Sequence, residues 1–237
     1  MEYYYQEQLP ESGRFLLEVD EAFHAVKTRR RKVGDHIHLT NGKGAVAEVK
    51  LTQADARKCE VEMLHYTIEK PFEPLFKLAV SPLKQEARFE WLIEKAVEMG
   101  VSDIIPLQCE RTEKVHLKFP RLERLMIAAM KQSLKAFLPR LHPVTSFKTL
   151  SAGFDQQHFL AHCLPSPKTL LLPSNIHSGA TLLIGPEGDF SETEIETALK
   201  LGVQAISLGE ARLRTETAAL VALGQAHHAY QIKNRND

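Results

Sequence analysis

The sequence predicts an α/β protein in which a small β-barrel precedes a mostly parallel sheet with flanking helices. Short runs that alternate at period 2 occupy the first 70 residues or so. Lys70-Pro71-Phe72-Glu73-Pro74 then places two prolines in a short polar stretch, which is typical of a domain boundary. Beyond it, strand and helix patterns alternate, as in a parallel sheet covered on both faces. We therefore expect domains at residues 1–72 and 73–237.

Length and composition exclude several other classes of protein. A chain of 237 residues with 43% hydrophobic and 25% charged residues can bury a core, and it is neither disordered nor fibrous in composition. No apolar run reaches the roughly 20 residues that cross a bilayer, so we expect no membrane partner. The N-terminus is acidic and lacks the pattern of a signal peptide. Cys59, Cys109 and Cys163 are odd in number and far apart, which favours a reducing compartment and a cytoplasmic location.

The first domain is predicted to contain strands at residues 15–17, 37–40, 45–49 and 59–63. Asn41-Gly42-Lys43-Gly44 indicates a hairpin turn between two of them, because Asn and Gly tolerate positive φ. Tyr3-Tyr4-Tyr5 is a candidate platform for stacking a base, but we favour a terminal strand packed on the barrel.

The second domain is predicted to alternate strands and helices. Its strands are expected at residues 75–80, 104–107, 158–161, 169–172, 181–184 and 205–208. Its helices are expected around residues 89–97 with an end at Gly100, over 120–137, from 191 to about 202, and over 215–233. The third of these helices begins with the capping box Ser191-Glu192-Thr193-Glu194.

Charge is unevenly distributed, although thirty basic residues balance thirty acidic ones. Residues 27–32 carry five cations and no acid, and residues 111–148 carry nine Lys or Arg against Glu113 and Glu123. Each segment is either a solvated surface or a basic face for phosphates. A neutral chain can present such a face because salt screens charges beyond roughly 8 Å, so distant acids do not cancel it. Two such segments in one neutral chain favour RNA or another polyanion as a partner.

Two glycine-containing loops are the best candidates for a ligand site. They are residues 184–190, Ile-Gly-Pro-Glu-Gly-Asp-Phe, and residues 208–218, Leu-Gly-Glu-Ala-Arg-Leu-Arg-Thr-Glu-Thr-Ala. Each joins the carboxyl end of a predicted strand to a helix, which is where parallel sheets bind ligands. Neither matches a dinucleotide or P-loop fingerprint, and either alone is typical of an ordinary turn. Their occurrence in consecutive strand-to-helix units favours a shared site.

In order and spacing, these loops resemble those of the SPOUT superfamily of knotted RNA methyltransferases. In detail they resemble the bacterial 16S ribosomal RNA uridine N3-methyltransferases of the RsmE type. Similar matches lie in residues 88–101, in Lys131-Gln132-Ser133 with Pro139, and in His24, Arg30, Lys32, Gly34 and Asp35 of the first domain. The resemblance implies a PUA-like barrel, a trefoil-knotted sheet, a homodimer, and S-adenosylmethionine as methyl donor with no metal. It implies 16S ribosomal RNA as the substrate, in the assembled small subunit.

The resemblance also implies roles for single residues. Contacts to the cofactor fall on Ile184, Gly185, Gly188, Leu208, Gly209, Leu213 and Thr215. Arg214 would stabilise negative charge on the uracil, with Glu187 or Glu216 as a base or an orienting partner. The alternative for Arg214 is a salt bridge to Glu216 or Glu210 that only caps the last helix. The clustering of charge, rather than the resemblance, predicts that Arg30 and Lys32 of the barrel and Lys131, Lys135 and Arg140 of the second domain bind RNA phosphates.

The sequence departs from the family pattern at four places. Asp189 stands where many members have a second Gly. At the three positions of Glu210-Ala211-Arg212, the family more usually has a basic residue, then Arg or Val, then Ile. Ser133-Leu134-Lys135 replaces Ser-Gly-Arg, and Thr28-Arg29 replaces an apolar pair. The first two changes leave the cofactor loops intact, whereas the last two fall on segments that would contact RNA.

Two other functions stay open from the sequence. One is a related SPOUT methyltransferase that acts on a tRNA or on another ribosomal nucleotide, and the other is a ribosome-binding module without catalysis. A zinc site is not predicted, because His158 and His162 share one face of a predicted strand while Cys163 faces away.

Overall fold

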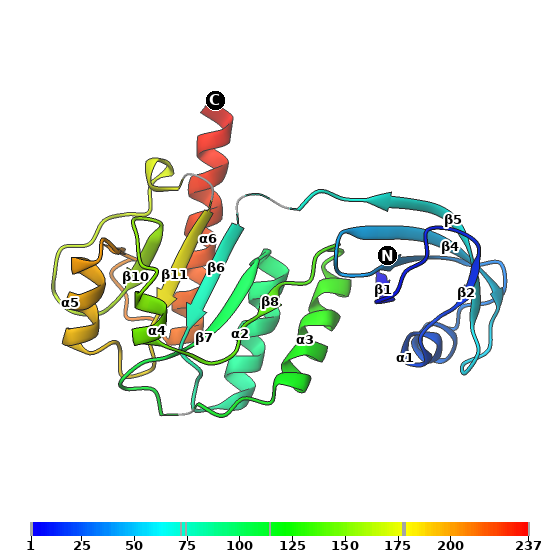
Figure 1. The fold of residues 1–237 in the computed structure, drawn as a ribbon, viewed down its shortest axis with the longest axis horizontal. Coiled ribbons are helices and arrows are strands. Elements are labelled where there is room, and N and C mark those ends of the chain that lie inside the picture. Colours follow the sequence, from blue (N-terminus) through cyan, green and yellow to red (C-terminus); the bar gives the residue numbers. More distant parts are fainter. Residues whose placement is uncertain (1, 72, 74, 114, 177–178, 237) are drawn as a thin grey trace. The chain divides into compact units, whose positions relative to one another are not determined.

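The computed structural model describes residues 2–71, 73, 75–113, 115–176 and 179–236. The chain divides into two compact units, one of Met1–Pro71 with Ile127–Leu138 and one of Phe72–Met126 with Pro139–Asp237 (Figure 1). The segment Ile127–Leu138, which the sequence assigned to the second domain, thus belongs to the first unit. The domain boundary after residue 72 stays a prediction.

Five strands form the sheet of the first unit, in the order β1-β3-β4-β5-β2. They are β1 (Tyr3–Tyr5), β2 (Arg14–Leu16), β3 (His36–Thr40), β4 (Ala45–Gln53) and β5 (Glu60–Ile68). β1 runs parallel to β3, and the other neighbours are antiparallel. The predicted strands of this domain are therefore present, and the tyrosines form the terminal strand.

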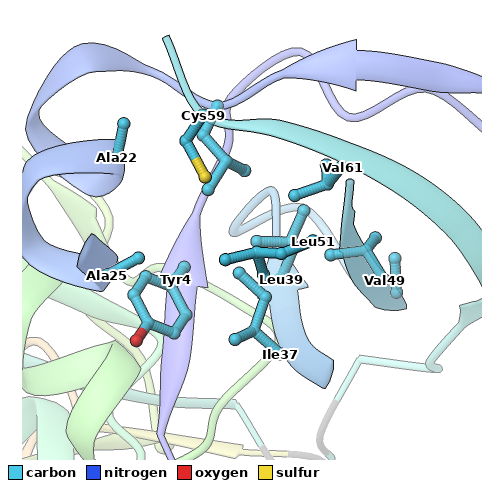
Figure 2. Packing of buried hydrophobic residues seen from close by; sticks show 11 residues of the cluster. Tyr4, Ala22, Ala25, Ile37, Leu39, Val49, Leu51, Cys59 and Val61 are labelled. Carbon is cyan, nitrogen blue, oxygen red and sulfur yellow. The ribbon is translucent and has the colours of Figure 1, made fainter. Parts of the chain in front are cut away.

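The core of the first unit includes a short helix that the sequence did not predict. α1 (Val19–Phe23) continues directly into η1, a π-helical turn at His24–Thr28. Ala22 and Ala25 of this segment are fully buried in a cluster with strand residues such as Leu39 and Leu51, as Figure 2 shows. A five-residue helix gives too little periodicity to be recognised, and most of its stability comes from packing.

The segment after α3 packs on the hairpin between β3 and β4. Leu138 N donates to Gly42 O at 2.8 Å, and Gly44 N donates to Ala136 O at 2.9 Å. Gly44 has a φ of +101°, and a Cβ there would lie 2.6 Å from the ring of Phe137. Glycine is therefore required at this position for both its backbone angle and its size.

The second unit contains a sheet in the order β12-β10-β11-β6-β7-β8, with β9 also paired to β7. Its strands are β6 (Leu75–Val80), β7 (Asp103–Gln108), β8 (Arg140–Leu141), β9 (Thr145–Ser146), β10 (His158–Ala161), β11 (Gly179–Ile184) and β12 (Gln204–Ala205). All of these pairings are parallel. The predicted parallel sheet is confirmed.

Helices cover both faces of this sheet (Figure 1). On one face, α2 (Glu86–Met99) packs against α6 (Thr215–Asn236), and α6 packs on β6 and β11. On the other, α4 (Phe147–Ser151) and α5 (Glu192–Lys200) contribute Phe147, Ile195 and Ala198 to a cluster that contains Ala79 and Leu183. α3 (Phe119–Gln132) and the 3₁₀ turn η2 (Pro173–Asn175) complete the elements. No helix of the described residues is long and apolar enough to cross a membrane.

Three predicted elements differ from the structure. The helix expected over 120–137 ends at Gln132, because Leu134 adopts a φ of +55° and Lys135 N donates back to Met130 O. The strand expected at 169–172 is reduced to a single bridge between Thr169 and Ile206. β12 is shorter than expected, while the capping box of Ser191 and Glu194 is confirmed. The trefoil knot stays a prediction.

Candidate functional site

The two glycine loops lie at one edge of the second unit's sheet. The first follows β11 and leads into α5, and the second follows β12 and leads into α6. Because β10 lies between β11 and β12, the loops flank the residues that follow β10. The carboxyl ends of parallel strands are the usual ligand-binding edge of such a sheet.

Two adjoining cavities open between these loops, of about 410 Å³ and about 480 Å³. Their volumes fall in the range of small-molecule sites. Residues that line both are Ala161, Cys163, Asp189, Arg212, Leu213 and Ala218. The site is therefore built from the ends of three neighbouring strands and the start of α6.

Most of the predicted site residues lie in these cavities. The first is lined by Ile184, Gly185, Glu187, Leu213, Arg214 and Thr215, and the second by Leu208, Gly209 and Leu213. Gly188 lines neither cavity, and its carbonyl oxygen accepts a hydrogen bond of 2.9 Å from Arg111 Nη1. Glu216 lines an adjacent groove instead, together with Arg88 and Arg214.

The first loop depends on two unusual backbone positions. A Cβ on Gly185 would lie 3.0 Å from both the ring and the backbone nitrogen of Phe190, so this turn has little room for a side chain. Asp189 adopts a φ of +65°. Its carboxylate accepts from Phe190 N at 2.8 Å and from Cys163 N at 2.7 Å. Aspartate tolerates the left-handed region because of such local bonds, which explains how it replaces the glycine of the family pattern.

The second loop offers open backbone to a ligand. Gly209 has a φ of +113°, and a Cβ there would meet no atom within 4 Å. In the same cavity the Nδ1 atom of His162 is buried and has no hydrogen-bond partner in the described part of the chain. Burial and the nearby Lys168 lower the pKa of His162, so its neutral form is favoured. An open glycine and an unsatisfied buried nitrogen fit a bound polar small molecule.

A partly buried ion pair holds the start of α6. Arg88 Nε and Nη2 donate to the two carboxylate oxygens of Glu216 at 2.8 and 2.6 Å. The Glu216 side chain is only 10% exposed. Both of its oxygens are therefore engaged, which suits an orienting role better than that of a base. The sequence did not single out Arg88, since its partner lies 128 residues away and no local pattern joins them.

Arg214, unlike Glu216, has a side chain without a partner in the described residues. It is exposed, and within the described residues its guanidinium makes no hydrogen bond or ion pair. The salt bridge to Glu216 or Glu210 that the sequence left open is thus not formed. Glu187 is also exposed, and its Oε1 accepts from the backbone nitrogen of Lys84 at 3.2 Å. A free cation and a carboxylate therefore line the same cavity.

The expected RNA-binding cations differ in how free they are. Arg30 and Lys32 have no side-chain partner in the described chain, and Arg140 is exposed. Lys131 forms an ion pair with Glu21 and is 20% exposed. Burial lowers the pKa of Lys135. Lys131 and Lys135 belong to the unit that carries Arg30 and Lys32, while Arg140 belongs to the other.

Among the described residues, no group of three or more His, Cys, Asp or Glu side chains is placed to hold a metal ion. His158 instead bonds to Asp155 at 2.7 Å. The two cavities are lined by backbone groups together with arginine, carboxylate, cysteine and histidine side chains.

Two family models match this chain. Residues 70–227 match the family model described as RNA methyltransferase domain, and residues 17–64 match the RNA methyltransferase PUA domain. Ribosomal RNA small subunit methyltransferase E of Bacillus subtilis (strain 168) is 29% identical over 96% of this chain and 94% of its own length.

Two solved structures resemble the fold over nearly the whole chain. A probable rRNA-methyltransferase from Porphyromonas gingivalis is 36% identical with a TM-score of 0.88, covering 98% of this chain and 99% of that one. A ribosomal RNA small subunit methyltransferase E from Neisseria gonorrhoeae, bound to S-adenosyl methionine, is 27% identical with a TM-score of 0.85. That match covers 97% of this chain and 98% of the other.

Proposed function

This chain belongs to the RNA methyltransferase family, and from that premise we propose that it methylates N3 of a specific uridine in 16S ribosomal RNA. The methyl donor is S-adenosylmethionine, and the substrate is the assembled small subunit. The observation that carries the proposal is the cavity of about 410 Å³, in which an unpaired Arg214 stands beside two glycine loops. The relatives named as ribosomal RNA small subunit methyltransferase E support the choice of RNA.

The cofactor would be held mainly by backbone groups of the two loops. Ile184, Gly185 and Thr215 line one side, Leu208 and Gly209 line the other, and Leu213 lies between them. Gly188 would act through the shape of its loop, since it lines neither cavity. When bound, S-adenosylmethionine supplies a methyl group on a positively charged sulfur.

The protein's part in the reaction is to position the uracil and stabilise its charge. Uracil N3 carries an imide proton, which would have to leave before the nitrogen could take the methyl group, and the electron pair of the broken carbon–sulfur bond would stay on sulfur. Arg214 stabilises the negative charge on the uracil oxygens, because guanidinium stays charged and donates paired hydrogen bonds. Glu187 accepts the proton, and Glu216, fixed by Arg88, orients the groups at the start of α6.

RNA would be held outside the cavity by cations of both units. Arg30 and Lys32 would bind phosphates from the first unit and Arg140 from the second. Lys131 and Lys135 would contribute less, because Lys131 is paired with Glu21 and Lys135 is partly buried. In terms of the predicted domains, the PUA-like domain of residues 1–72 carries Arg30 and Lys32, and the methyltransferase domain of 73–237 carries Lys131, Lys135 and Arg140. A homodimer in the bacterial cytoplasm completes the proposal.

The proposal is tested with the purified full-length protein and small subunits from cells that lack the gene. We expect transfer of labelled methyl from S-adenosylmethionine to 16S RNA, and digestion should give labelled N3-methyluridine. Naked 16S RNA, added in parallel, should be a poorer substrate than the subunit. A different labelled nucleoside would favour a related enzyme, and cofactor binding with no transfer to any ribosomal RNA or tRNA would favour a binding module.

A further inference from the structure

Trp91 is the chain's single tryptophan, and it lies on the outer side of α2. The buried face of this helix consists of Phe89, Leu92, Ile93, Ala96 and Val97. Trp91 is 46% exposed. Since a large aromatic side chain gains stability from burial, a half-exposed tryptophan contributes little to the core and suits a contact with a ligand.

Trp91 lines a groove of about 330 Å³ next to the proposed cofactor cavity. The groove is formed by Ala87, Arg88, Trp91, Arg214, Glu216 and Thr217. Arg88 and Arg214 also line the cavity of about 410 Å³. A molecule in the groove therefore contacts the same arginine that faces the cavity of the methyl donor.

We infer that this groove holds the target uracil, stacked on the indole of Trp91 with its O4 carbonyl oxygen toward Arg214. The inference rests on the proposed function and names the binding site of its substrate. A base buried in an RNA stack is out of reach, so it must be taken out at a cost of a few kcal/mol. Stacking on an aromatic side chain offsets that cost, and guanidinium donors match the uracil oxygens.

The charges of the groove favour a polar, planar ligand over an apolar protein surface. Arg88 and Glu216 neutralise each other in their two-bond pair, which leaves Arg214 as the free charge among the lining residues. A second copy of the chain that covered Trp91 with apolar side chains would also cover this cation without a partner, which is costly. A uracil that becomes anionic on losing its N3 proton supplies the missing charge.

Fluorescence tests the inference directly, because the emission of the single tryptophan reports on this groove. The protein is loaded with S-adenosylhomocysteine, which cannot donate a methyl group, and titrated with uridine 5′-monophosphate. We expect saturable quenching. Cytidine 5′-monophosphate should quench only at higher concentration, because an amino group replaces the oxygen that accepts from Arg214. Tryptophan emission that does not change on addition of nucleotide overturns the inference. Emission that changes only with protein concentration, because a second copy covers Trp91, also overturns it.

Kinetics of three variants provide an independent test. Trp91→Ala should lower kcat/KM for the small subunit about tenfold, mainly through KM, because stacking on one base is lost. Trp91→Phe keeps an aromatic face and should stay within about threefold of the wild type. Leu199→Ala is the matched control, since Leu199 is 42% exposed on α5 and lies outside the groove. An unchanged KM in folded Trp91→Ala, or an equal loss in Trp91→Phe and Trp91→Ala, contradicts stacking.

The wild-type protein separates this inference from the proposed function. If it forms N3-methyluridine while Trp91 neither responds to nucleotide nor affects KM, the groove assignment fails and the proposed function stands. If the wild type forms no methyluridine on ribosomal RNA, the proposed function fails and this inference with it.

Discussion

At the residue scale, the site depends on which charged side chains are free. Glu216 has both oxygens engaged by Arg88, whereas Arg214, two positions earlier, makes no side-chain bond within the described chain. Neighbours in the sequence thus differ in what they can do for a substrate. The family resemblance suggested Arg214 and Glu216 as site residues, but not that one is unpaired and the other paired, because the pairing depends on an arginine of another helix.

Removing Arg214 should abolish most activity and leave the fold intact. In Arg214→Ala we expect kcat to fall about 100-fold, because a donor to the charged oxygen is lost. The thermal midpoint should not change, since the side chain is exposed and unpaired. Arg124→Ala removes another exposed, unpaired arginine of the same unit as the control, assayed at saturating subunit. Near-normal turnover in Arg214→Ala would sink its catalytic assignment.

Cysteine labelling should report on occupation of the cavities. Cys163 is exposed and lines both of them, while Cys59 and Cys109 are buried. Burial raises the pKa of Cys59 to about 11 and raises that of Cys109 as well, so neither forms much thiolate at neutral pH. Iodoacetamide should therefore modify Cys163 first, and S-adenosylmethionine should slow the reaction as it fills the site. A labelling rate unaffected by saturating cofactor, measured by mass spectrometry of the intact protein, would place the cofactor elsewhere.

At the element scale, local patterns found the strands and helices better than their ends. Gly100 ends α2 in the left-handed conformation, as its position after the apolar stripe predicts. At the end of α3 this signal is missing, because Leu134 occupies the left-handed position. The predicted helix therefore ran on to residue 137. α1 was missed because a short helix within a run of mixed charge has no clear period.

Leu134→Gly should stabilise the protein. A bulky residue in the left-handed region costs roughly 1–2 kcal/mol, which glycine would relieve. Glycine would also lower the stability by about 0.5–1 kcal/mol, because it gives the unfolded chain more conformational freedom. Leu134 is 40% exposed, so little packing is lost. We expect a gain of about 0.5–1 kcal/mol in the free energy of unfolding from urea titration. Leu134→Ala keeps the strain and should show no gain; equal stability of the two variants would argue against strain at this turn.

At the scale of the whole molecule, a net charge of zero conceals cations that are not equivalent. In the stretch 111–148, Lys118, Arg121 and Lys131 are paired with Glu86, Glu90 and Glu21. Counting charges along the sequence therefore overstates the surface available to phosphate. Which cations are free depends on acids distant in the chain, and no segment count contains that information.

The affinity for RNA should fall steeply as the salt concentration rises, and Arg30 and Lys32 should account for part of this salt dependence. Each phosphate contact contributes roughly 0.7–0.9 to the slope of log K against log salt, so Arg30→Ala with Lys32→Ala should lower its magnitude by about 1.5. Arg57→Ala, which removes an exposed cation outside both basic stretches, is the control. A flat salt dependence of the wild type, or an unchanged slope in the double variant, would count against this surface.

The most direct test of the account is mass spectrometry of 16S RNA from cells that carry the gene, lack it, or carry its Arg214→Ala form. We predict one N3-methyluridine in the first RNA, none in the second, and little in the third. Unchanged 16S modification in the cells without the gene would contradict the account.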